Sequence, residues 1–133
     1  LTYLDEGKYL YTFDIIKNDF VLFNQKINHA PSNYLFQNAI ILKSANFLQA
    51  INIENGKTFW LIEDKEISKN STILGIRSID KKIEIFLSDG NVLVIKNKKL
   101  DKKINLDISK INSISFENLN IIISTKSGKT LIF

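Results

Sequence analysis

Short apolar runs separated by small polar turns recur along the whole chain. Three segments share one arrangement, in which an apolar run, a turn and a second apolar run follow each other: residues 40–51, 84–95 and 122–133. A weaker copy lies at residues 3–13. Each of these four segments is predicted to form a β-hairpin, because short apolar runs that flank a tight turn are typical of paired strands.

The residues at the centre of each hairpin support this interpretation. The predicted turns contain small or polar residues that are common in tight turns: Gly7, Asn46, Asp89 with Gly90, and Ser127 with Gly128. Glycine and asparagine tolerate the positive φ that tight hairpin turns require. These turns recur every 38 to 44 residues, which indicates an internal repeat.

Further strands complete the repeating unit. A short apolar segment precedes each later hairpin, at residues 31–36, 71–76 and 112–116, and a clear fourth strand follows at 54–62. The unit is therefore a meander of four short antiparallel strands, about 40 residues long, which is typical of a β-propeller blade. The predicted fold class is all-β, a β-propeller of four-stranded blades, with a β-sandwich and an open β-solenoid as alternatives.

The unit fits about three and a half times into the 133 residues. We therefore expect one partial β-propeller domain over residues 1–133, an incomplete ring. The chain starts with Leu1 and ends at Phe133 inside a third strand, so we expect the C-terminal part of a larger propeller. Such a segment would expose apolar blade faces and unpaired strand edges. A protein partner, or self-association through these edges, is expected to cover them.

The charge of the chain does not indicate a nucleic-acid partner. The formal net charge is +4, and all but one of the basic residues are lysines. The densest basic run, residues 96–103 (KNKKLDKK), has no interleaved aromatic side chains that would stack on bases. It predicts a solvated hairpin, so no nucleic acid is expected among the partners.

Residues that carry common chemistry are scarce. The chain has no cysteine and one histidine, His29, in a predicted loop. A thiolate nucleophile and a histidine-based metal cluster are therefore excluded for this chain. There is no Gly-x-Ser-x-Gly motif and no glycine-rich phosphate loop. We expect no catalytic residue, metal or cofactor, and hence a protein that is not an enzyme.

One segment, residues 50–60 (AINIENGKTFW), carries a recognisable motif. It resembles the repeat signature of quinoprotein-like β-propellers, Ala-x-Asp-x-x-Thr-Gly-x-x-x-Trp. The motif comprises Ala50, Gly56, Lys57 and Trp60, in which Lys57 takes the open position after the Gly, with Asn52 and Asn55 in place of the Asp and the Thr. The resemblance implies that the Ala and the Trp dock adjacent blades and that the Gly makes the turn between the third and fourth strands.

Within that group the chain looks most like the propeller lipoprotein of the bacterial outer-membrane β-barrel assembly machinery. This signature and the final hairpin of residues 116–133 carry the likeness. The resemblance implies a non-catalytic scaffold that binds the central assembly subunit. It also implies a periplasmic location at the outer membrane, with a lipid anchor outside this segment as the membrane attachment.

Two other functions on the same fold stay open. One is a fragment of a quinone (PQQ)-dependent dehydrogenase. Such enzymes stack the cofactor between a tryptophan and, often, a disulfide of adjacent cysteines, and this chain has no cysteine. A propeller that binds peptides or glycans would present exposed aromatic residues on the loops between its strands. Tyr34 and Phe36 fit a buried strand better than such a loop.

Overall fold

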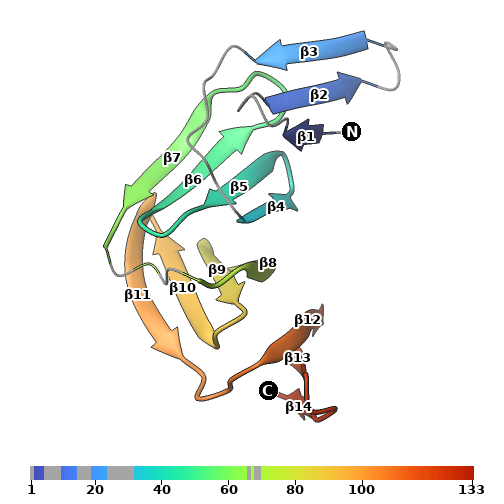
Figure 1. The fold of residues 1–133 in the computed structure, drawn as a ribbon. Helices are drawn as coiled ribbons and strands as arrows, with labels where there is room; N and C mark the ends of the chain where they lie inside the picture. Colours follow the sequence, from blue (N-terminus) through green and yellow to red (C-terminus); the bar gives the residue numbers. More distant parts are fainter. Residues whose placement is uncertain (1, 5–9, 15–18, 24–31, 66, 68–69) are drawn as a thin grey trace.

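The computed structural model describes residues 2–4, 10–14, 19–23, 32–65, 67 and 70–133, and side chains from residue 32 onward (Figure 1). Every regular element among these residues is a β-strand. In chain order they are β1 (Thr2–Leu4), β2 (Leu10–Asp14), β3 (Asp19–Phe23), β4 (Ser32–Phe36), β5 (Ala39–Lys43), β6 (Phe47–Asn52), β7 (Thr58–Glu63), β8 (Ile73–Ile79), β9 (Lys82–Leu87), β10 (Asn91–Lys96), β11 (Lys99–Asn105), β12 (Ile111–Glu117), β13 (Asn120–Thr125) and β14 (Thr130–Ile132).

The strands form four antiparallel meanders. Two sheets have four strands, in the orders β4-β5-β6-β7 and β8-β9-β10-β11, and two have three, β1-β2-β3 and β12-β13-β14. The basic run of residues 96–103 forms the β10–β11 hairpin, and the side chains at its tip are exposed. Each sheet connects every strand to its chain neighbour, as the predicted unit requires.

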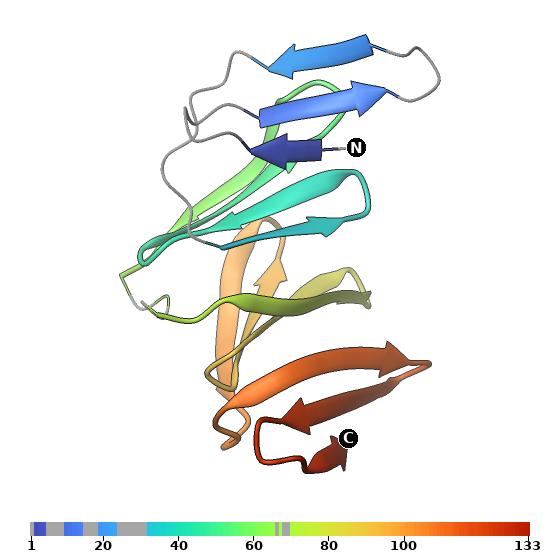
Figure 2. The ribbon, with the colours of Figure 1, turned by 45° about the vertical axis from the view of Figure 1, so that its right-hand side comes forward.

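The four sheets follow one another along an open arc (Figures 1 and 2). The first strands β4, β8 and β12 lie on its concave side, where β4 contacts β8 and β8 contacts β12. Because consecutive sheets face one another, the middle strands are covered on both faces: all five residues of β5 are buried, as are four of the six in β10. This explains why strict apolar–polar alternation is lost in these strands.

The turns between the second and third strands contain most of the predicted turn residues. Gly90 and Gly128 have φ values of 87° and 83°, as tight hairpin turns require. Asp89 and Ser127 precede them in the same turns. The predicted turn at Gly7 lies outside the described residues.

Asn46 corrects one expectation. It lies in the β5–β6 turn but does not adopt a positive φ. Instead, the Ser44 hydroxyl donates a hydrogen bond to Asn46 Oδ1 (3.1 Å), and the Ser44 N–H donates to the carbonyl of Phe47 (3.0 Å). These bonds close the turn without the left-handed conformation that was expected of Asn46.

Candidate functional site

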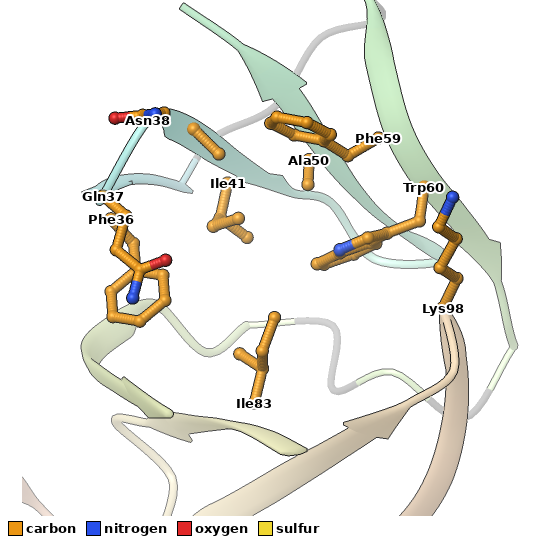
Figure 3. A pocket seen from close by; sticks show the side chains of 10 residues that line it. Phe36, Gln37, Asn38, Ile41, Ala50, Phe59, Trp60, Ile83 and Lys98 are labelled. Carbon is orange, nitrogen blue, oxygen red and sulfur yellow. The ribbon is translucent and has the colours of Figure 1, made fainter. Parts of the chain in front are cut away.

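A groove of about 350 Å³ lies where the sheet β4–β7 meets the sheet β8–β11 (Figure 3). Its main walls are Phe36, Ala50, Phe59 and Trp60 from the first sheet and Ile83 and Lys98 from the second. Trp60 and Lys98 lie on one side, with Phe36 and Gln37 across from them. The groove is therefore mostly apolar and is shared by two sheets.

A β-bulge shapes one wall of the groove. Ala50 pairs with Trp60 and Ile51 pairs with Thr58, which leaves Phe59 without a partner on β6. A bulge of this kind interrupts the alternation of side chains and re-aims them. As a result the adjacent residues Phe59 and Trp60 both line the groove, although neighbours on a regular strand point to opposite faces.

The next sheet has the same bulge with different residues. There Val94 pairs with Lys102 and Ile95 pairs with Leu100, so Asp101 is the unpaired residue. Asp101 and Lys102 thus occupy the places of Phe59 and Trp60, and both are exposed. The fold therefore does not need an aromatic pair at this position.

The motif of residues 50–60 divides into two parts. One part builds the β6–β7 turn: Asn52 Oδ1 accepts from the N–H of Glu54 (2.8 Å), and Asn55 Oδ1 accepts from the N–H of Lys57 (2.9 Å). Gly56 adopts φ 70° and donates its N–H to the carbonyl of Asn52 (2.9 Å). Both asparagines supply the side-chain acceptors that such turns use.

The other part of the motif, Ala50 and Trp60, lies at the junction of the two sheets. Ala50 is buried, and the partly buried Trp60 packs against the core that the two sheets share, as do Ile83 and Leu100. Trp60 is also among the residues that line the groove. Trp60 thus both joins the sheets and lines the groove.

Charge at the groove comes from one side chain. Among the described residues, Lys98 is the one charged residue that lines it. Lys98 lies in the β10–β11 turn with φ 62°. The amide side chains of Gln37 and Asn38 in the β4–β5 turn supply the polar groups of the opposite rim. The groove therefore combines an apolar floor, a cation and neutral hydrogen-bonding groups.

Sequence reasoning missed a buried lysine that joins β5 to the segment just before β8, away from the groove. Lys43, at the end of β5, is 2% exposed, and its Nζ donates to the carbonyl of Ser71 (2.7 Å). Burial lowers the pKa of Lys43 below its ordinary value of 10.5, and the Asp89 carboxylate opposes part of this shift. Nothing in the local pattern IILKSAN distinguishes this lysine from an exposed one at the end of a strand.

The described residues offer no cluster for metal chemistry. Within those ranges, no three His, Cys, Asp or Glu side chains gather in a way that could hold a metal ion. His29 lies outside them. The described part of the chain also lacks a helix long and apolar enough to cross a membrane.

No protein-family model and no curated protein matches the sequence. Solved structures do match. BamB from Moraxella catarrhalis aligns with a TM-score of 0.64 and 13% identity, over 98% of this chain and 41% of its own. The computationally designed Ika4 protein aligns with a TM-score of 0.65 and 12% identity, over 99% of this chain and 82% of its own. A chain in the complex of the fission yeast SREBP–SCAP binding domains aligns with a TM-score of 0.65 and 16% identity, over 99% of this chain and 42% of its own.

The fold is a β-propeller, here an incomplete ring. At these identities the alignments show the fold alone, and natural and designed propellers match about equally well. The likeness to BamB is therefore not specific within the propellers. The chain spans less than half the length of the natural propeller chains it matches here, BamB and the fission yeast protein.

Proposed function

We propose that this propeller is a non-catalytic scaffold that binds other proteins, and that it works in the assembly of outer-membrane β-barrel proteins. The observation that carries the proposal is the alignment of nearly the whole chain with solved β-propeller structures. One is BamB, and another was solved in the complex of the SREBP–SCAP binding domains.

The character of the groove supports a binding role over a catalytic one. Acid–base and nucleophilic catalysis use a titratable or nucleophilic side chain, and a nucleophile is commonly activated by a second titratable group beside it. The charged side chain at the described walls of the groove is Lys98, and the other walls are apolar or carry neutral amides. Surfaces of this composition, with aromatic residues at their centre, are typical of protein recognition.

The outer-membrane role rests on two likenesses taken together. The motif that includes Ala50 and Trp60 resembles the signature of quinoprotein-like propellers, and BamB is among the structural matches. We place the protein in the periplasm, attached to the outer membrane by a lipid anchor outside this segment. Its partner in this proposal is the central barrel-assembly subunit.

The test is co-purification of the native gene product from its own cells. The product is epitope-tagged on the chromosome, cells are cross-linked and fractionated, and the proteins joined to the tag are identified by mass spectrometry. We expect the tag in the outer-membrane fraction, joined to the central assembly subunit. A tagged product in the cytoplasmic fraction, or one that cross-links only to unrelated proteins, would contradict the assembly role.

A further inference from the structure

We propose that the groove between the sheets β4–β7 and β8–β11 binds a short extended segment of a partner protein. The segment carries a bulky apolar side chain, preferably aromatic, next to a carboxylate. This assignment rests on the proposed scaffold function, and it names the site and the chemistry of the partner that the scaffold function leaves open.

The aromatic wall is the first observation. Phe59 is a large apolar side chain at the junction between the sheets, and it is 43% exposed in the chain as it stands. The equivalent bulge in the next sheet carries Asp101 and Lys102, so blade geometry alone does not explain Phe59 and Trp60. Exposed aromatic residues in a concave surface are the usual anchors of protein recognition.

The size of the groove decides which kind of occupant fits. Its volume of about 350 Å³ lies at the lower end of the range for ligand pockets, roughly 300 to 1,000 Å³. One large side chain with its flanking backbone fills such a space, whereas a flat folded surface would leave it empty. The occupant is therefore a peptide segment that presents one anchor residue.

Charge selects the neighbour of that anchor. Lys98 stands beside Trp60 at the rim, and no carboxylate of the described residues lines the groove to neutralise it. A carboxylate next to the apolar anchor complements this ammonium group. Across the groove, the amides of Gln37 and Asn38 can donate to and accept from the backbone of an extended peptide.

The chain contains its own reporter for the test. Trp60 is the single tryptophan and lies in the groove, so its fluorescence reports occupancy of this site. The probes are three unlabelled peptides. They are Gly-Ser-Phe-Asp-Ser-Gly, the same peptide with Asn for Asp, and the same peptide with Ala for Phe. We expect a saturable change with the Phe-Asp peptide and at least fivefold weaker binding of the other two.

Two variants and two matched controls assign the site. Phe59→Asp copies the residue at the equivalent bulge, and its control Leu61→Asp changes an exposed residue of the same strand that does not line the groove. Lys98→Glu reverses the rim charge, and its control Lys81→Glu does so in the β8–β9 turn at nearly the same φ, 61°. Circular dichroism checks that every variant is folded.

The groove variants should weaken binding of the Phe-Asp peptide at least fivefold, while the controls stay within twofold of the wild type. Lys98→Glu should also bind a Phe-Lys peptide better than the wild type does. Equal affinity for all peptides, equal losses in variants and controls, or no fluorescence change at millimolar peptide would overturn the assignment. Co-purification in cells is measured separately, so peptide binding without the assembly subunit would contradict only the outer-membrane role.

Discussion

Two glycines at equivalent turns of successive sheets stand in different surroundings. A Cβ added to Gly90 would lie 2.2 Å from the carbonyl oxygen of Ile108, whereas nothing lies within 4 Å of the same position at Gly128. Both have positive φ. The two positions therefore separate the effect of backbone conformation from that of close packing.

Gly128→Ala should destabilise the chain by roughly 1–2 kcal/mol, because alanine is strained in the left-handed region. Gly90→Ala should lower the free energy of unfolding by about 1–3 kcal/mol more than Gly128→Ala does, since the backbone must also move away from Ile108. Urea unfolding of both variants beside the wild type measures the two losses. Equal losses would mean that the contact with Ile108 does not limit this turn.

Lys43 gives the stability of the protein a pH dependence with a defined sign. Because burial lowers its folded-state pKa, the unfolded chain binds more protons between that lowered pKa and the ordinary value of 10.5. The contribution of Lys43 to the free energy of unfolding therefore rises with pH through this window. Below the lowered pKa, the full desolvation cost of the charged form is present.

Lys43→Met removes this titration. We expect the stability of the wild type relative to this variant to increase as the pH is raised toward 10.5, measured by urea unfolding at several pH values. Lys99→Met, at an exposed position, serves as the control and should show no such trend. A constant difference between the wild type and Lys43→Met would contradict a lowered pKa at this site.

At the scale of the elements, one arginine joins the sheets β8–β11 and β12–β14. Arg77 Nε donates to Glu84 Oε2 (2.6 Å), and Nη1 donates to the carbonyl of Leu119 (3.2 Å). Its guanidinium also lies 5.6 and 5.7 Å from the ring centroids of Phe86 and Phe116. A planar group with several donors can make these contacts together, and an ammonium cannot.

Arg77→Lys should therefore loosen the last sheet, by roughly 1–2 kcal/mol for the lost hydrogen bonds and ring contacts. Hydrogen exchange measures this locally: amides of β12 and β13 should exchange faster in the variant, while those of β5 and β6 keep their wild-type rates. Uniform acceleration across all sheets would show that Arg77 stabilises the whole chain instead of one junction.

The elements also show what the sequence could and could not predict. Meanders of short strands follow from local patterns and turn residues, so the all-β propeller fold was predictable. The groove was not, because it needs strands that are distant in the chain; the N–H of Ile73, for example, donates to the hydroxyl of Ser32, 41 residues away. The bulge at Phe59 could not be predicted from the sequence either, because one unpaired residue changes the direction of the side chains without changing the apolar pattern.

For the whole molecule, the open arc leaves its last sheet with apolar residues in contact with solvent. Leu119, Ile132 and Phe133 are all more than half exposed, and β14 pairs with β13 alone among the described strands. An uncovered edge with apolar side chains is a site for association with another strand. We expect the 133-residue chain to self-associate through this edge when no partner is present.

Analytical ultracentrifugation over a range of concentrations tests this expectation. The wild type should show mass that increases with concentration, and Ile132→Lys should shift the chain toward the monomer, because a lysine on an edge strand opposes pairing. Ser127→Lys adds the same charge in the neighbouring turn and should have little effect. A wild type that stays monomeric at every concentration would contradict association through β14.

The bulge shared by two successive sheets has a consequence for how such a protein can change over evolutionary time. The pattern of strand pairing is the same whether the bulge presents Phe59 and Trp60 or Asp101 and Lys102. The residue pair at this bulge can therefore be replaced while the strands keep their register. Two substitutions at such a bulge therefore change which side chains the strand presents there, without a new loop.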